Sequence, residues 1–190
     1  MKDSSVLDNL RQATHAAHQA LEDQADVEAR LRDPARRTAV VTALLDMHAG
    51  AEAALDPWRV ALAALGVPFP DRSAALRIDL KALGGAVVTP TQATVADLGQ
   101  ALGWTYVIEG SALGGRVMLK RMKAAGVDLT GLGHLDIHGD QAGVRWRKVL
   151  GALDAAVGAG LPEPAIVRGA CDAFAFAHRI LAPRPSEIAA

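Results

Sequence analysis

The spacing of apolar residues along this chain is typical of helices. In the first segment they recur every three or four positions and predict a helix from about Val6 to Glu22, with a buried stripe of Leu7, Leu10, Thr14, Ala17 and Leu21. Ser5 and Asp8 are placed as a capping box at its start. β-Branched and aromatic runs of strand length are scarce, so the pattern favours an all-α protein.

The rest of the chain repeats this pattern between turn signals. Asp33-Pro34 opens a second helix, which continues past a kink at Asp56-Pro57 to Gly66. Further helices are predicted at about residues 71–83, 92–123, 141–157 and 164–181, with Pro183 and Pro185 ending the last one. Residues 22–32 and 126–140 are predicted as connections. The predicted fold is one all-α domain over residues 1–190, an irregular helical bundle.

Composition and charge narrow the functional classes. Hydrophobic residues make up 51% of the 190 positions, and the net charge of -1 comes from dispersed charged residues, which gives no basic surface for nucleic acid. Cys171 is the only cysteine, so the chain has no internal disulfide and no Cys-x-x-Cys site. Because no apolar run is long enough to span a bilayer and the N-terminus lacks a signal core, we expect a soluble cytoplasmic protein with no membrane partner.

The segment Tyr106–Lys120 departs from an ordinary helix because glycines interrupt it. Each glycine in a helix interior costs about 1 kcal/mol relative to alanine. Gly103, Gly110 and Gly114 are seven and four residues apart, so they fall on one helical face. A face without Cβ atoms suits either a broad, flat ligand or the close packing of another helix, and the spacing leaves both interpretations open.

A second group of polar residues lies on the first helix. Glu22 follows His18 by one turn and can accept a hydrogen bond from one imidazole nitrogen, which leaves the other nitrogen as a metal ligand. Arg11 lies about 10 Å before His18 on the same side, where its charge can meet a carboxylate of a large anionic ligand. The alternative, which spacing alone favours, is an ordinary surface pair and a solvated charge.

The other histidines and the cysteine are interpreted as structural. His134 and His138 are four residues apart in a predicted loop, without the further ligands that a zinc site needs. His48 and His178 lie on apolar helices and are interpreted as partly buried. Cys171 lies on an apolar helix and is interpreted as core packing.

An imidazole on one helix and a helix face without side chains elsewhere describe a slot for a flat metal-bearing macrocycle. Residues 13–22, Ala-Thr-His-Ala-Ala-His-Gln-Ala-Leu-Glu, preceded by Leu10-Arg11, resemble the proximal helix of haem oxygenases. Residues 106–115, Tyr-Val-Ile-Glu-Gly-Ser-Ala-Leu-Gly-Gly, resemble their distal helix, in the form found in bacterial members and especially in those that accompany bacteriophytochromes. Weaker similarity continues through His138-Gly139 to Trp146 and the last helix.

The resemblance implies roles for the residues that match. His18 matches the proximal iron ligand, and Glu22 matches its hydrogen-bonding neighbour. Arg11 matches a basic residue that contacts a haem propionate. Gly110 and Gly114 match the distal glycines whose backbone approaches iron-bound oxygen.

Other positions match less directly. Ser111 stands where animal members carry an aspartate that organises distal water, and this is a departure from the animal pattern. Gly115 is expected to contact the haem beside the distal glycines. Tyr106, Arg145 and Arg147 are candidates for a second propionate contact.

The activity that the resemblance implies is oxidative opening of haem to biliverdin, with release of carbon monoxide and iron. Haem b is then substrate and cofactor at once, and O2 is the oxidant. The chain has no flavin or iron–sulfur motif, so electrons are expected from an external donor such as ferredoxin. A bacteriophytochrome is a candidate recipient of the biliverdin.

Two other functional classes stay open at this point. A haem carrier would keep His18 but would not turn haem over. A thiaminase-like enzyme of the same general fold would need an acidic pocket and a reactive cysteine, for which Cys171 alone is weak support.

Overall fold

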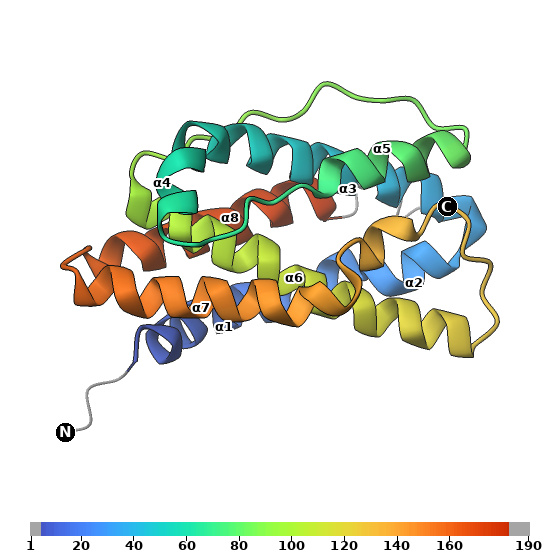
Figure 1. Cartoon of the computed structure of the whole chain (residues 1–190). Helices are drawn as coiled ribbons and strands as arrows, with labels where there is room; N and C mark the ends of the chain where they lie inside the picture. The colour runs from blue at the N-terminus through green and yellow to red at the C-terminus, as the bar shows by residue number, and fades with distance from the viewer. Residues whose placement is uncertain (1–4, 183–190) are drawn as a thin grey trace.

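A computed structural model describes residues 5–182, and the regular elements in this range are all helical (Figure 1). The longer helices are α1 (Val6–Ala25), α3 (Pro34–Leu55), α5 (Arg72–Ala82), α6 (Leu98–Ala124), α7 (Ala142–Gly158) and α8 (Glu163–Leu181). The shorter ones are α2 (Val27–Arg32), α4 (Arg59–Ala64) and the 3-10 helices η1 (Asp56–Trp58), η2 (Gly133–Asp136) and η3 (Gly139–Gln141). The all-α prediction is confirmed. The predicted end at Pro183 and Pro185 lies outside the described residues.

The helix starts predicted at Ser5 and Asp33 are confirmed. The Ser5 hydroxyl oxygen accepts a hydrogen bond from the backbone N–H of Asp8 at 3.2 Å. The Asp33 carboxylate accepts one from the backbone N–H of Ala35 at 2.9 Å, with proline in the first turn of α3. Both caps satisfy donors that the first turn of a helix leaves without an intrahelical partner.

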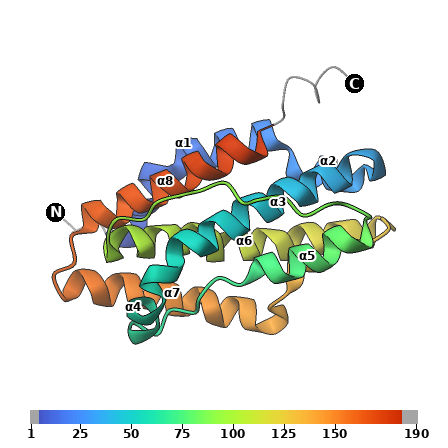
Figure 2. The same ribbon diagram turned by 90° about the horizontal axis from the view of Figure 1, so that it is seen from above.

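Helix α6 crosses the middle of the bundle and packs most extensively against α8 (Figures 1 and 2). A Cβ atom on Gly103 of α6 would lie 2.5 Å from the backbone nitrogen of Ala170, and one on Gly169 of α8 would lie 2.5 Å from Cα of Gln100. Backbone atoms cannot yield to such contacts, so only glycine permits this crossing. Gly103 therefore serves helix packing.

Two predictions about the central helix are wrong. It begins at Leu98 rather than near Gln92, because the Asp97 carboxylate caps it by accepting a backbone hydrogen bond at 2.8 Å. The residues before Asp97 run as an irregular segment along the bundle (Figure 1). The glycines also do not interrupt the helix, which is continuous to Ala124. Packing against neighbouring helices outweighs their low intrinsic helix propensity.

The two segments predicted as connections contain helices as well. Residues 22–32 complete α1 and form α2, with Asp26 at a φ of 38° turning the chain between them. Aspartate tolerates this left-handed conformation better than most residues. Residues 126–140 contain η2 and the start of η3, and η2 is held by Asp79, whose carboxylate accepts from the backbone N–H of His134 at 2.6 Å. Asp79 belongs to α5, so the local sequence around η2 could not predict this hydrogen bond.

Buried leucines from helices along the whole described range share one apolar core. Those that are at most 1% exposed include Leu10 of α1, Leu45 of α3, Leu80 of α5, Leu102 of α6 and Leu153 of α7. They fix α1, α6 and α7 relative to one another, and these three helices carry the candidate site residues. Within residues 5–182, no helix combines the length and the apolar character needed to span a bilayer.

Candidate active site

Helices α1 and α6 run in the same direction through the bundle (Figures 1 and 2). The Arg11 side chain of α1 lies close enough to Tyr106 of α6 for its charge to act on the Tyr106 hydroxyl group. Burial raises the pKa of Tyr106, and the Arg11 guanidinium partly offsets the effect. His18 lies seven residues further along α1 and Gly114 eight residues further along α6, so both are about 10–12 Å beyond the contact. Both candidate groups therefore lie on the C-terminal side of this contact, each on its own helix.

His18 projects from α1 with a side chain that is 55% exposed. Its Nδ1 lies 3.4 Å from Oε2 of Glu22, so the two side chains lie side by side, as the four-residue spacing predicts. The Phe174 ring of α8 packs edge-on against the imidazole, with centroids 5.6 Å apart and an interplanar angle of 69°. With Nδ1–H directed at the carboxylate, the lone pair of Nε2 is the one that can bind a metal.

One face of α6 lacks the side chains that would block a ligand, and we call Gly110, Ser111, Gly114 and Val117 the open face. A Cβ atom on Gly114 would have no neighbouring heavy atom within 4 Å. Val117 is an apolar side chain that is nevertheless 53% exposed. At Gly110 a Cβ atom would lie 3.3 Å from the ring of Trp146, whose centroid is 5.2 Å from that of Tyr106. The open face therefore offers backbone and apolar surface to a flat ligand.

Gly115 has a different environment from Gly114. A Cβ atom on Gly115 would lie 2.9 Å from the carbonyl oxygen of Leu135, and the residue is buried against η2. Its missing side chain admits η2 against α6, so the structure gives Gly115 a packing role. The glycines of α6 therefore serve different purposes. Gly103 and Gly115 allow other segments to pack closely, whereas Gly114 leaves room for a ligand.

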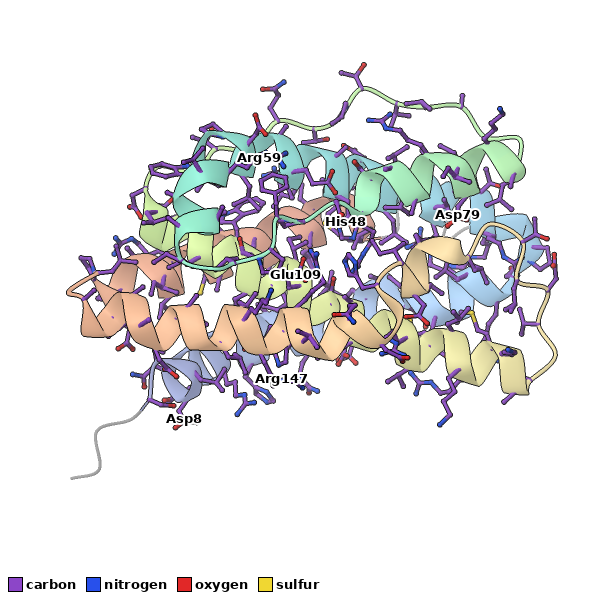
Figure 3. The ribbon with its side chains drawn as sticks, viewed as in Figure 1. Asp8, His48, Arg59, Asp79, Glu109 and Arg147 are labelled. Carbon is purple, nitrogen blue, oxygen red and sulfur yellow. The ribbon has the colours of Figure 1, made fainter. Side chains whose placement is uncertain are left out.

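The two arginines of α7 that were candidates for a propionate contact differ in their surroundings. Arg145 donates to Glu109 from Nε at 3.0 Å and from Nη2 at 2.7 Å, and also to the carbonyl oxygen of Phe69 at 2.9 Å. Burial lowers the pKa of Arg145, but Glu109 outweighs this and the pKa is raised. Arg145 is committed to a buried ion pair, which makes it the less suitable of the two for a propionate. Arg147 is exposed at the edge of α7 (Figure 3) and remains the candidate from this helix.

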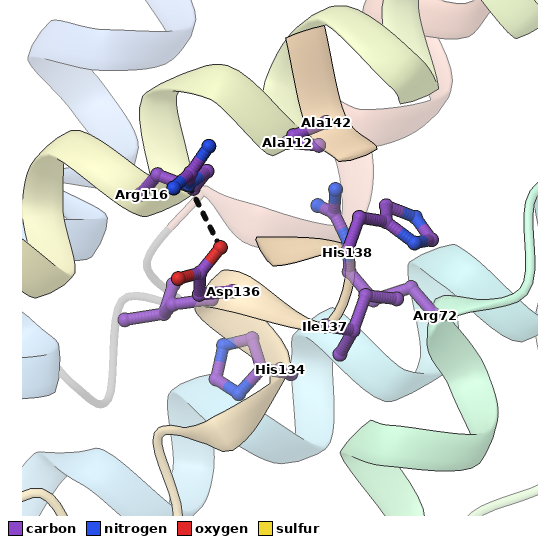
Figure 4. Close-up of a pocket in the computed structure, with 9 residues that line it drawn as sticks. Arg72, Ala112, Arg116, His134, Asp136, Ile137, His138 and Ala142 are labelled. Carbon is purple, nitrogen blue, oxygen red and sulfur yellow. Dashed lines mark ion pairs between the residues drawn. The ribbon is translucent and has the colours of Figure 1, made fainter. Parts of the chain in front are cut away.

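A buried polar cluster is made of His48, Arg72, Asp79 and His134, of which Figure 3 labels His48 and Asp79 and Figure 4 labels Arg72 and His134. Nη1 of Arg72 lies 3.3 Å from Nε2 of His48 and donates to the Ser111 hydroxyl oxygen at 3.0 Å. Nδ1 of His134 lies 2.8 Å from Oδ2 of Asp79. His134 lies in η2 rather than in a loop and is 2% exposed, and His48 is buried completely rather than partly, at 1%.

Sequence reasoning missed this cluster, although one signal was present. Arg72 and Asp79 of α5 lie seven residues apart, on the stripe that also carries the buried Leu76 and Leu80. Charged residues at the apolar positions of an amphipathic helix are rarely left unpaired in a core. Such a pattern predicts buried partners elsewhere in the chain without identifying them.

Burial sets the protonation of this cluster. Burial and then the charge of Arg72 lower the pKa of His48 well below its ordinary value. Burial also lowers the pKa of His134, although Asp79 opposes the shift. Burial alone would raise the pKa of Asp79, but hydrogen bonds from His134 lower it. At neutral pH both imidazoles are therefore neutral, His134 donates from Nδ1 to the Asp79 carboxylate, and Arg72 donates to Nε2 of His48.

The residues on α1 and α6 fit a haem group. His18 presents an accessible nitrogen, its ring is oriented by Glu22 and Phe174, and the open face of α6 can approach a flat macrocycle without a steric barrier at Gly114. Arg11 supplies a cation beside Tyr106 of α6. An anionic macrocycle with a ligand-seeking metal matches this set of groups.

Comparisons with known proteins agree with the geometry. The family model described as "Heme oxygenase" matches residues 4–183. A heme oxygenase of Xanthomonas campestris pv. campestris (strain 8004) is 31% identical over 134 residues, which cover 70% of this chain and 81% of that protein. The NO- and CO-bound heme oxygenase from Neisseria meningitidis has a similar fold, with a TM-score of 0.72 over 93% of this chain and 90% of that one, at 24% identity. Together, the family match and the Xanthomonas relative show that this chain belongs to the heme oxygenase family.

Proposed function

We propose that this chain opens haem b oxidatively to biliverdin and releases carbon monoxide and iron, using O2 and electrons from an external reductant. Membership of the heme oxygenase family supports the activity. The observation that carries the proposal is the pairing of His18 with Glu22 on α1 beside an open helix face at Gly114. We further propose that residues 1–190 act as one domain, since the apolar core joins helices from both ends of the chain.

His18 is proposed as the only protein ligand to the haem iron. Glu22 accepts the Nδ1 proton, which keeps Nε2 unprotonated and increases its basicity as a ligand. Phe174 restricts rotation of the imidazole from the side. Bound haem would supply both the iron at which O2 is activated and the carbon framework that is cleaved.

Charged and polar groups on α1, α6 and α7 are proposed to orient the haem. Arg11 already contacts Tyr106, so this pair forms a prearranged site for one propionate. Arg147 is proposed for the second propionate, because it is exposed on α7 and its neighbour Arg145 is committed to Glu109. Holding both carboxylates would orient the macrocycle within the site.

On the other side of the macrocycle, Gly110 and Gly114 let the α6 backbone approach closely, and Gly115 supports this part of α6 by admitting η2 behind it. A helix so close restricts the space on this side and excludes bulk water. Ser111 is exposed there and can anchor a water molecule through its hydroxyl group. Backbone groups and such water are the proposed proton donors to the reacting oxygen.

Two protein partners are also proposed. The chain carries no flavin or iron–sulfur motif, so a donor protein such as ferredoxin is proposed as the source of electrons. The distal-helix sequence at residues 106–115 supports a bacteriophytochrome as the recipient of biliverdin. Electron donation by ferredoxin and transfer of biliverdin to a bacteriophytochrome both fit a reducing compartment such as the cytoplasm, where Cys171 stays reduced.

The test is a haem titration followed by reduction in air. The purified chain is expected to bind haemin at one equivalent with a Soret band, and addition of ascorbate or a ferredoxin system should replace that band with bile-pigment absorbance and release carbon monoxide. A Soret band that survives reduction without pigment would instead identify a haem carrier. Absence of stoichiometric haem binding would reject both.

A further inference from the structure

The side of α6 that carries the open face continues towards the end of the helix as far as Arg121. Arg121 follows Gly114 by seven residues, so it lies about two turns further along the same side. Val117, which stands between them, is 53% exposed, and the Arg121 side chain is 59% exposed. The row of residues that should face the haem therefore ends in a cation.

Arg121 forms an ion pair with the helix that follows α1. Its Nη2 lies 2.7 Å from Oε2 of Glu28, which belongs to α2. Figure 1 shows α2 beside the C-terminal part of α6. Because α2 follows α1 directly after the turn at Asp26, the ion pair ties the end of the helix that carries His18 to the end of α6.

Helices α1 and α6 are thus joined at two levels along their length. The first is the contact of Arg11 with Tyr106. The second, through α2, is the ion pair of Glu28 with Arg121. His18 and the open face lie between these two levels along their helices. A tetrapyrrole held between α1 and α6 therefore lies in a space whose width both contacts restrict.

The Glu28 carboxylate belongs to a small network rather than to an isolated pair. Its Oε1 accepts hydrogen bonds from Nε and Nη2 of Arg32, one turn later in α2, at 3.3 and 2.8 Å. The Glu28 side chain is 24% exposed, less than either arginine. Because Arg32 already restricts the rotamers of Glu28, Oε2 is presented to Arg121 at little further cost in side-chain entropy. One arginine orients the carboxylate, and the other spans the two helices.

We infer that the ion pair of Glu28 with Arg121 is a strap across the haem site, which must open for haem or biliverdin to pass between α1 and α6. This inference rests on the proposed function. The strap re-forms once the ligand has passed, so it slows entry and exit by the same factor and leaves the affinity unchanged. Biliverdin is an open, non-planar chain of four pyrrole rings, and its passage requires at least as much separation of the helices as that of flat haem.

The experiment measures exchange rates for Arg121→Gln, which removes the charge that spans the helices. Haem dissociation is followed by transfer to excess apomyoglobin, and haem association by stopped-flow mixing with monomeric CO-haem. Biliverdin association and dissociation are followed by visible absorbance. Both rate constants should rise about twofold to fivefold for haem, and at least as much for biliverdin, which is the range that one exposed ion pair can supply. The Kd for haem should change by less than about twofold.

Matched variants separate the strap from a general effect of charge. Arg59→Gln breaks an exposed ion pair with Asp56 elsewhere in the bundle and should leave exchange unchanged. Arg121→Lys keeps the cation and should stay close to the unchanged chain. Glu28→Gln should accelerate exchange, and the double variant with Arg121→Gln should be no faster than the faster single one. The acceleration should shrink as NaCl rises from about 0.05 M to about 1 M, because salt screens exposed charges.

Stability is the remaining control. The melting temperature of Arg121→Gln should fall by at most about 4 °C, since an exposed ion pair contributes little to stability. If both Arg121→Gln and Glu28→Gln fail to fold, the pair serves stability and the inference is overturned.

The rates decide the rest. Unchanged exchange in Arg121→Gln overturns the inference. Faster loss of haem without faster capture also overturns it, because the ion pair would then stabilise the bound complex. Equal acceleration of entry and exit that is absent from Arg59→Gln supports it. A chain that binds haem without cleaving it still reports on the strap through haem exchange, so failure of the proposed function is distinguishable from failure of this inference.

Discussion

The two sides of α6 are built in opposite ways. On the open face, Gly114 has no neighbour within 4 Å of a would-be Cβ atom and Val117 is 53% exposed. On the side facing η2 and α7, Gly115 admits the Leu135 backbone, and the 4% exposed Glu109 is paired with Arg145. The protein itself fills one side, whereas the other side needs a ligand to cover it. The same kind of residue therefore has a different purpose on each side of one helix.

Because of this difference, substitutions on the filled side should affect stability, whereas substitutions on the open face should affect haem binding. On the side that faces η2 and α7, charged groups such as Glu109 and Arg145 pair with each other. Removing one of them leaves the other charge buried and unpaired in a low-dielectric environment. Groups on the open face make few contacts within the chain, and removing them should spare the fold. Substitutions on one side of α6 at a time should therefore distinguish effects on the fold from effects on haem binding and turnover.

The largest effect is expected from a pair of glycine variants. Gly103→Leu places a side chain into the backbone of α8, where nothing can yield, and should lower the free energy of unfolding by more than about 3 kcal/mol or prevent folding. Gly114→Leu meets no neighbour and improves helix propensity, so stability should hold while haem affinity falls at least about tenfold. Urea unfolding and haem titration measure the two effects. Equal stability losses in both variants would mean that both glycines serve packing.

The buried ion pair should come next. Arg145→Met leaves the Glu109 carboxylate buried without its partner and should cost about 3–5 kcal/mol in the free energy of unfolding. The double variant Arg145→Met with Glu109→Leu removes both charges and should recover most of that loss. A double variant as unstable as the single one would assign the loss to packing rather than to the unpaired charge.

A smaller effect is expected from acidification. His48 and His134 stay neutral in the fold because burial lowers their pKa values, whereas in the unfolded chain they titrate near about pH 6.5. Below that pH the unfolded state binds more protons, so stability should fall as pH decreases towards the lower native pKa values, by up to about 1.4 kcal/mol per pH unit for each histidine. Urea unfolding between about pH 7.5 and 5.5 measures the slope, and His48→Gln should make it shallower. A flat profile would mean that these histidines are protonated in the fold.

The smallest effect is expected at Ser111. Replacement by alanine removes one neutral hydrogen-bond anchor on the open face, worth about 0.5–1.5 kcal/mol, which corresponds to turnover slowed about threefold to tenfold if it is felt fully in the transition state. Biliverdin should still form, and the unfolding curve should change little. Single-turnover kinetics on the haem complex provide the measurement. A variant that stops completely would mean that Ser111 is indispensable for proton delivery.

Local sequence predicted the parts that depend on local contacts. The caps at Ser5 and Asp33 and the pairing of His18 with Glu22 involve residues no more than four positions apart, and all three are present. Regular spacing also located most helices, since an amphipathic stripe requires burial whatever the partner. The start of α6 was misplaced because a single side chain, Asp97, decides it.

Contacts between distant residues could not be read from the sequence. The hydrogen bond from Arg72 to Ser111 joins residues 39 positions apart, and the contact of His134 with Asp79 joins residues 55 positions apart. The residues next to His134 do not indicate whether its side chain is exposed in a glycine-rich segment or buried in the core. For the same reason, Gly103, Gly114 and Gly115 looked alike, because what each glycine faces depends on helices that come much later or earlier in the chain.

The central claim is that haem iron binds His18 beside the open face of α6. It is tested most directly by the absorption spectrum of the ferric haem complex of His18→Ala, recorded with and without added imidazole. Since removal of His18 leaves a space beside Phe174, we expect the variant to lose the normal five-coordinate spectrum and all turnover, and to regain part of the normal ligand field when imidazole is added. A variant that keeps both the normal spectrum and full activity would show that another histidine holds the iron and would contradict the account.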